Sequence, residues 1–206
     1  MADTLSPLES SAAISRTNQI TDDEAALYDR QIRLWGVEAQ KRLREANVLI
    51  AGIDGVGSEI VKNIVLAGIN SLTILDNKLI SKYDTTCNLF THRQLGQARA
   101  KVAAEHVQAL NPMVKVTHEV EDINGKDEAF FTSFHVVCLS GYGKETQTYV
   151  NNICRKLKIK FYSVCSWGMF AFGFVDLGKG HSSVEQFPAF PEVDEMYFLQ
   201  RPRTPY

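Results

Sequence analysis

The sequence has few cysteines, no clustered metal ligands and little net charge. Its four cysteines lie far apart with no Cys-x-x-Cys pair, which argues against a zinc knuckle or a redox dithiol and favours free thiols in a reducing compartment. None of the five histidines lies at metal-ligand spacing from another, so no metal site is expected. The formal net charge of -2, without a long basic block, argues against nucleic acid as a partner.

Long apolar runs and a signal-peptide pattern are also missing. No run is long enough to cross a bilayer, and the first 18 residues lack the basic-then-apolar order of a signal peptide. We therefore expect residues 1–20 to form a flexible tail on an intracellular protein with no membrane partner. Residues 181–206 carry four prolines and little periodicity, which predicts an extended arm or linker.

Between these ends the chain alternates strand patterns with helix patterns. Its 206 residues, 45% of them hydrophobic, are enough for one good core. Strands are expected at residues 48–51, 71–76, 114–120, 136–140 and 159–165. Helices are expected at residues 21–36, where Thr21 and Glu24 form a capping box, and at 37–45, 60–66, 96–110 and 144–157. Such alternation predicts an α/β fold over residues 21–180, with a Rossmann-like, doubly wound, mostly parallel sheet and flanking helices.

A glycine-rich turn follows the first strand. In the dinucleotide pattern Gly-x-Gly-x-x-Gly, the middle glycine lets the backbone approach a pyrophosphate at a helix N-terminus. Gly52 and Gly57 fit this pattern, but Asp54 occupies the middle place and Gly55 follows it. The tight turn and close helix packing are therefore expected to survive, whereas the carboxylate repels phosphate. Asp76, at the end of the next strand, is placed for a ribose hydroxyl, but with a poor phosphate loop it is interpreted as a relic of such a site or as a cap for the following turn.

Several separate stretches carry a family resemblance. Together they resemble the adenylation domain of enzymes that activate ubiquitin-like proteins, and of the bacterial relatives MoeB and ThiF. These stretches are residues 28–36, 52–57, 72–76, 96–100 and 111–112. Within that family, residues 111–114, 121–123, 130–131 and 137–139 are most similar to the small, regulatory subunit that serves the modifier SUMO. Because such subunits are usually longer, the chain is interpreted as truncated at its C-terminal side.

The resemblance implies an ATP-dependent reaction that adenylates the C-terminus of a ubiquitin-like modifier. Active members read Asp, then Asn-x-x-Arg-Gln, then Gly-x-x-Lys, then a further Asp after the fourth strand. Here Asp76 keeps the first place, but Asp84 replaces the Asn, Cys87 the Arg and Arg99 the Lys, and residues 136–141 supply no carboxylate. Gly52, Gly55, Gly57, Asp76 and Arg99 are therefore expected to be a degenerate nucleotide site. The chain alone is expected to bind no cofactor and to have no activity, with ATP and magnesium held in a partner's site.

The resemblance also implies a positive role for Arg30. In family members this arginine reaches into the partner subunit's ATP site, so a chain with a degenerate site can still supply a catalytic cation. The alternative is that Arg30 is an ordinary surface charge paired with Asp22, Asp23 or Asp29. The neighbouring Tyr28, Gln31, Leu34 and Trp35 are expected to contact the partner, although for Leu34 and Trp35 packing in the chain's own core is equally consistent with the pattern.

The hypothesis is therefore a non-catalytic subunit of a heterodimeric SUMO-activating enzyme. Its implied partners are the catalytic large subunit and, through the complex, SUMO, and its implied location is mainly the nucleus with a cytoplasmic share. Two alternatives remain open: the small subunit of another modifier's activating enzyme, and a stand-alone Rossmann nucleotide-binding enzyme.

Overall fold

The computed structural model describes residues 21–92 and 94–178, which fall into two compact units. One unit ends at Glu45 and the other begins at Ala46, and each is described by itself. The predicted tail at residues 1–20 and the predicted arm at 181–206 lie outside the described residues. No helix in the described part is long and apolar enough to cross a membrane.

The N-terminal unit contains helices α2 (Asp22–Leu27) and α3 (Asp29–Glu45). The predicted capping box is confirmed, because the Glu24 backbone donates to Thr21 Oγ1 at 3.3 Å and the Thr21 backbone donates to the Glu24 carboxylate at 2.9 Å. A single helix over residues 21–36 was wrong, since the backbone leaves the helical region at Tyr28 (φ -101°, ψ 14°). The predicted interruption at Gly36 is confirmed by its φ of 85°, which divides α3 in two.

The second unit is built on a six-stranded sheet. Its strands are β1 (Asn47–Ala51), β2 (Ser71–Leu75), β3 (Lys115–Glu119), β4 (Val136–Ser140), β5 (Lys160–Trp167) and β6 (Phe170–Asp176). Their order is β3-β2-β1-β4-β5-β6, and all neighbours are parallel except β5 and β6, which are antiparallel. The predicted Rossmann-like, mostly parallel sheet is thus confirmed, but strand β6 was not among the predicted strands.

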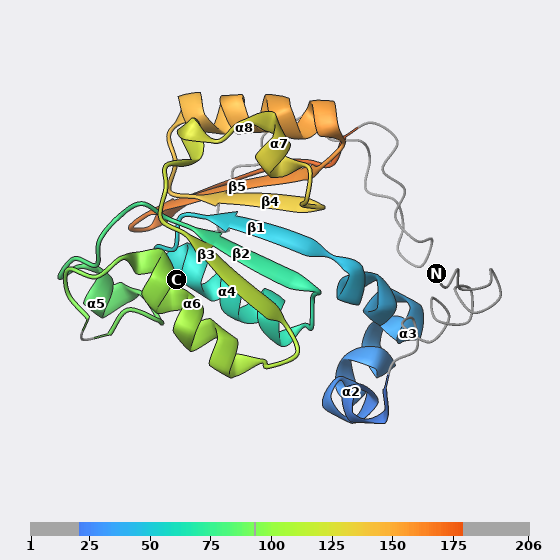
Figure 1. The fold of residues 1–206 in the computed structure, drawn as a ribbon. Coiled ribbons are helices and arrows are strands. Elements are labelled where there is room, and N and C mark those ends of the chain that lie inside the picture. The colour runs from blue at the N-terminus through green and yellow to red at the C-terminus, as the bar shows by residue number, and fades with distance from the viewer. Residues whose placement is uncertain (1–20, 93, 179–206) are drawn as a thin grey trace, which may run out of the picture. The chain divides into compact units, whose positions relative to one another are not determined.

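Helices cover both faces of this sheet (Figure 1). They are α4 (Gly55–Leu66), α5 (Asp84–Cys87), α6 (Arg99–Leu110), the 3-10 turn η1 (Ile123–Gly125), α7 (Glu128–Phe131) and α8 (Lys144–Leu157). Helices α4 and α6 pack on one face, and α7 and α8 lie on the other. The helix expected from residue 96 begins only at Arg99, because Gly96 has a φ of 78° and Ala98 is extended (φ -65°, ψ 121°).

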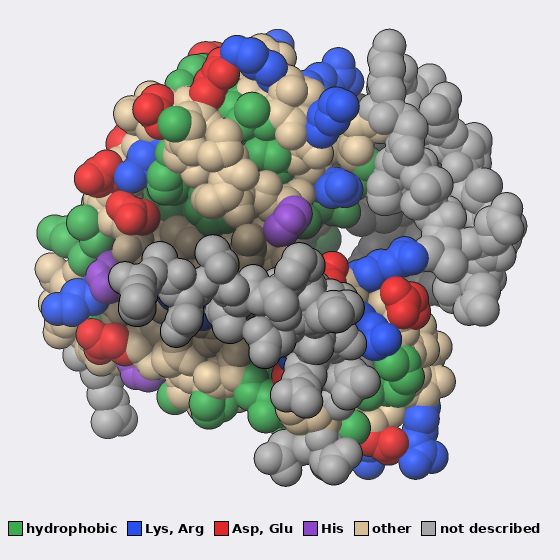
Figure 2. Space-filling view, turned by 45° about the vertical axis from the view of Figure 1, so that its right-hand side comes forward, with side chains coloured by type: hydrophobic (Ala, Val, Ile, Leu, Met, Phe, Trp, Pro, Cys, Tyr) green, Lys and Arg blue, Asp and Glu red, His purple; other side chains and the backbone are tan. Residues whose placement is uncertain are grey.

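A core of aliphatic and aromatic side chains lies between the sheet and helices α7 and α8. Leu49, Phe131, Leu139 and Phe161 belong to it and are each 0% exposed. On the face shown in Figure 2, hydrophobic, acidic and basic side chains of the described residues are interspersed. Because β1, β2 and β4 run parallel, their carboxyl ends meet at one edge of the sheet, where the polar site residues gather.

Candidate functional site

The turn between β1 and α4 is packed too tightly to accept any side chain at two of its glycines. A Cβ atom on Gly52 would lie 2.1 Å from the carbonyl oxygen of Ser140, and Gly52 has a φ of 85°. A Cβ on Gly57 would lie 2.1 Å from the carbonyl oxygen of Gly52. At Gly55 the contact would be looser, 3.1 Å from the carbonyl oxygen of Cys87. The glycines therefore bring the turn, α4 and the end of β4 together, whatever they bind.

Asp54 caps helix α4 from within this turn. Its Oδ1 accepts hydrogen bonds from the backbone N–H of Gly57 at 2.8 Å and from the hydroxyl of Ser140 at 2.7 Å. A Cβ on Gly141 would lie 2.6 Å from the Asp54 Oδ2, so the glycine makes room for this carboxylate. The first turn of a helix leaves its N–H groups without intrahelical partners and favours negative charge. A carboxylate of the chain itself therefore lies where the fold usually favours an anion.

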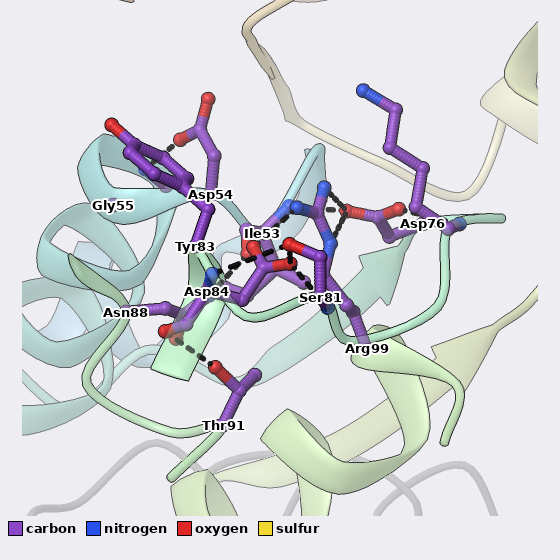
Figure 3. Close-up of polar contacts among 12 residues, drawn as sticks. Ile53, Asp54, Gly55, Asp76, Ser81, Tyr83, Asp84, Asn88, Thr91 and Arg99 are labelled. Carbon is purple, nitrogen blue, oxygen red and sulfur yellow. Dashed lines mark hydrogen bonds and ion pairs between the residues drawn. The ribbon is translucent and has the colours of Figure 1, made fainter. Parts of the chain in front are cut away.

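Arg99 lies between two buried carboxylates (Figure 3). Its Nη2 is 2.7 Å from Asp76 Oδ2 and its Nη1 is 2.7 Å from Asp84 Oδ1, with Nε also donating to Asp76 at 3.2 Å. The side chains of Asp76, Asp84 and Arg99 are 2%, 4% and 8% exposed. Together with Asp54 the site holds three carboxylates against one guanidinium, and that guanidinium is already paired with two of them.

Asp76 also holds two backbone segments. It accepts from the N–H of Ile53 in the glycine turn at 2.8 Å and from the N–H of Lys78 at 2.8 Å. The expectation that Asp76 caps the turn after β2 agrees with the second contact. The first contact links the ends of β1 and β2 to each other at the edge of the sheet.

Asp84 and its neighbours organise the loop from β2 to α6. The carboxylate of Asp84 accepts from the backbone N–H of Ser81 at 2.8 Å and from its hydroxyl at 2.7 Å. Asn88 donates to the carbonyl oxygen of Ile53, and Thr91 donates to the carbonyl oxygen of Asp84 at 3.1 Å. Asn88 and Thr91 are 1% and 0% exposed, and sequence reasoning missed both. Buried Asn and Thr inside a polar loop are a weak signal, because only their partners show what they do.

The charges of this network shift two pKa values in opposite directions. Burial acts to raise the pKa of Asp84, but hydrogen bonds from Ser81 and Arg99 outweigh it and hold that pKa below its ordinary value. Burial acts to lower the pKa of Arg99, but the carboxylates of Asp76 and Asp84 outweigh it and raise that pKa. Both groups are therefore charged at neutral pH, and each stabilises the charged form of the other.

The remaining positions at this edge are a cysteine and a tyrosine. Cys87 is exposed, and burial together with the Asp84 and Asp54 charges raises its pKa, so its thiol is not an activated nucleophile. The Tyr142 ring lies beside the glycine turn, where a Cβ on Gly52 would come within 3.2 Å of its Cε2. Sequence reasoning did not identify Tyr142, because nothing in the strand pattern before it indicates which way the ring turns.

The N-terminal unit carries the other set of predicted site residues. Arg30 is exposed in the first turn of α3, whereas Arg33, one turn later, forms an ion pair with Asp29 at 2.9 Å. Leu34 is 79% exposed, and Trp35 is 39% exposed with its indole N–H donating to Gln40 at 3.1 Å. Tyr28 is buried and Gln31 is half-buried. Leu34 thus does not pack in the core of its own unit, and Trp35 is exposed with its indole N–H held by Gln40.

Metal-ligand side chains do not cluster in the described ranges. Over residues 21–92 and 94–178, no group of three or more His, Cys, Asp or Glu side chains is arranged to hold a metal ion. The three carboxylates Asp54, Asp76 and Asp84 are engaged with N–H groups, hydroxyls and Arg99 instead.

Comparison with known proteins identifies the family of this fold and site. The model of the ThiF family matches residues 28–176, and the chain belongs to that family. Proteins named SUMO-activating enzyme subunit 1 are among its relatives. The protein of that name from Xenopus tropicalis is 45% identical over 168 residues, which cover 81% of this chain and 48% of the relative. The one from Homo sapiens is 45% identical over 177 residues, which cover 85% and 51%.

The chain spans about half the length of the curated relatives it matches. Among solved structures, E. coli MccB with succinimide matches at a TM-score of 0.66 and 17% identity, covering 75% of this chain and 49% of that one. E. coli tRNA N6-threonylcarbamoyladenosine dehydratase, TcdA, matches at a TM-score of 0.64 and 24% identity, covering 70% and 62%. These two structures share the fold of this chain.

Proposed function

We propose that this chain acts as the non-catalytic small subunit of a heterodimeric enzyme that activates SUMO. In that enzyme ATP adenylates the modifier's C-terminus in the site of the large, catalytic subunit, and this chain supplies Arg30 to that site. The choice of SUMO as the modifier is supported by the relatives from Xenopus tropicalis and Homo sapiens, which are named SUMO-activating enzyme subunit 1. The degenerate turn supports the non-catalytic role.

The exposure of Arg30 carries the proposal. Arg30 is exposed and forms no ion pair with any side chain that the structure describes, while Arg33 on the same helix is held by Asp29. An exposed guanidinium can reach a phosphate on another subunit, and its planar fork suits bidentate contact with phosphate oxygens. Arg30 is therefore available as a cation supplied in trans.

The chain's own turn is a poor nucleotide site for an electrostatic reason. Transfer at a phosphate depends on cations that stabilise the charge developing in the transition state. Here Arg99 is buried and paired with Asp76 and Asp84, and Asp54 adds a third negative charge beside the helix N-terminus. These residues do not fit ATP and magnesium, so we expect no turnover by the chain alone.

The test is modifier-dependent ATP–pyrophosphate exchange. The chain is co-expressed with the catalytic subunit of a SUMO-activating enzyme, and exchange is measured for wild type, Arg30→Ala and Arg30→Lys. Arg33→Ala is the matched control. It removes the same charge one helical turn further along α3, from a side chain that is already paired with Asp29. We expect exchange only from the pair, a loss of about 10³-fold or more in Arg30→Ala with an intact complex, and little change in Arg33→Ala.

Other outcomes decide between the alternatives. Exchange with a different ubiquitin-like modifier but not SUMO would assign the chain to another activating enzyme. Saturable ATP binding by the lone chain would instead favour a stand-alone nucleotide-binding enzyme. Equal losses in Arg30→Ala and Arg33→Ala would refute a specific role for Arg30.

A further inference from the structure

The anion-favouring place at the start of α4 is filled by the chain itself. Asp54 has an extended backbone (φ -82°, ψ -165°) that aims its carboxylate back at the helix, where it accepts the Gly57 N–H. The Ser140 hydroxyl, from the end of β4, donates to the same oxygen. A phosphate bound at such a turn is held by comparable N–H and hydroxyl donors. Asp54 thus uses the donors that an anionic ligand would need.

The cation of the site is used internally as well. All three kinds of guanidinium nitrogen of Arg99 donate to carboxylates: Nε and Nη2 to Asp76, and Nη1 to Asp84. Asp76 in turn holds the Ile53 N–H of the glycine turn, and Asp84 holds Ser81. The network therefore connects the turn after β1, the loop after β2 and the start of α6.

An aromatic side chain also lies beside the turn. The Tyr142 ring lies beside Gly52, the first glycine of the turn, where an added Cβ would come within 3.2 Å of its Cε2. Burial raises the pKa of Tyr142, and the nearby Asp76 and Asp122 charges raise it further, so the phenol is neutral at physiological pH. The Tyr142 side chain therefore adds no positive charge that would attract a phosphate.

We propose that this degenerate site is self-liganded: Asp54 substitutes for the anion, and Arg99 with Asp76 and Asp84 holds the loop that a nucleotide would otherwise order. The site is a structural element of the fold and not a vacant pocket. The inference concerns this chain alone and does not depend on the proposed pairing with a catalytic subunit.

The experiment measures whether removing Asp54 makes the turn responsive to an anion. Thermal unfolding of the purified chain is followed with and without millimolar pyrophosphate for wild type and Asp54→Gly. Glycine is chosen because it is tolerated as an N-cap, so the loss of stability should stay small. We expect no response in wild type, a lower Tm in Asp54→Gly, and a rise of about 2–4 °C when pyrophosphate is added to that variant.

Two further variants make the result decisive. Asp127→Gly removes another capping aspartate, which accepts the Phe130 N–H at 3.0 Å on helix α7, and should gain no response to pyrophosphate. Asp54→Ser keeps a hydroxyl cap without the charge and serves if the glycine variant does not fold.

Three outcomes would overturn the proposal. One is stabilisation of the wild type by pyrophosphate or Mg-ATP. Another is an equal response in Asp127→Gly. The third is the absence of any response in a folded Asp54 variant.

Discussion

The Arg99 guanidinium joins two carboxylates from different parts of the connection between β2 and α6, Asp76 just after β2 and Asp84 at the start of α5. Its Nη1 is 2.7 Å from Asp84 Oδ1 and its Nη2 is 2.7 Å from Asp76 Oδ2. Reaching both acids at once requires donors that point in different directions from one rigid plane, which a guanidinium has and an ammonium lacks. The family resemblance implies a lysine at this position in active relatives. The arginine found here can reach both carboxylates, which a lysine could not do.

Arg99→Lys should therefore destabilise the protein, although the substitution keeps the positive charge. A lysine could pair with only one of the two carboxylates and would leave the other buried without a cation. Breaking a buried ion pair in this way lowers the free energy of unfolding by about 3–5 kcal/mol. Arg155→Lys is the control, because Arg155 pairs with Asp176 but its side chain is 61% exposed, and the cost should stay below about 1 kcal/mol. Urea denaturation measures both, and equal losses would contradict the prediction.

Acidification should weaken the protein partly through Asp84. Because hydrogen bonds from Ser81 and Arg99 hold its pKa below the ordinary 3.8, Asp84 contributes stability above that pH and loses it as the pH falls through its pKa in the folded state. Asp84→Asn should be less stable than wild type at neutral pH but should lose less stability between about pH 5 and pH 2. Parallel pH profiles of the free energy of unfolding would show that Asp84 is not the group concerned.

The sheet could be predicted from sequence because its signals are local. Strand β4 and helix α8 have the bounds that their apolar patterns indicate, Val136–Ser140 and Lys144–Leu157. Strand β6 was missed although Phe170, Phe172 and Phe174 alternate as a half-buried strand requires. Three consecutive apolar side chains at its start and a central Gly173 obscured that alternation.

The polar network could not be predicted, because its partners are distant in sequence. Asn88 donates to a carbonyl 35 residues away, and Arg99 pairs with acids 15 and 23 residues away. The sequence indicated that Asp54 is wrong for phosphate, but not that its carboxylate occupies the helix N-terminus. Such pairings depend on the crossover of the chain between strands, which composition and periodicity do not specify.

Thiol labelling should distinguish one cysteine from the other three. Cys138, Cys154 and Cys165 are buried, and burial raises the pKa of both Cys138 and Cys154 to about 12. Only Cys87 is exposed, and since its pKa is also raised, its labelling should be slow at neutral pH and faster as the pH rises. Mass spectrometry after maleimide treatment should find one label per native chain and four in denaturant. Early labelling of Cys165 would contradict its placement in the core.

Gly57→Ala tests whether packing, and not a ligand, requires a glycine at this position of the turn. Helix propensity alone favours the change, because alanine in a helix is better than glycine by about 1 kcal/mol. The added Cβ, however, would lie 2.1 Å from the Gly52 carbonyl oxygen, which is backbone and cannot rotate away. Overpacking of this kind costs about 1–3 kcal/mol, so the steric effect should win and lower the Tm.

The control for this substitution is Gly125→Ala. A Cβ there meets nothing within 4 Å, and Gly125 is not among the described glycines with positive φ, so the change should stay within about 0.5 kcal/mol of wild type. Both variants are measured without nucleotide or pyrophosphate, which separates packing from ligand binding. If Gly57→Ala proved as stable as Gly125→Ala, the close approach of α4 to the end of β1 would not be a requirement of the fold, and a ligand would be needed to explain the glycine.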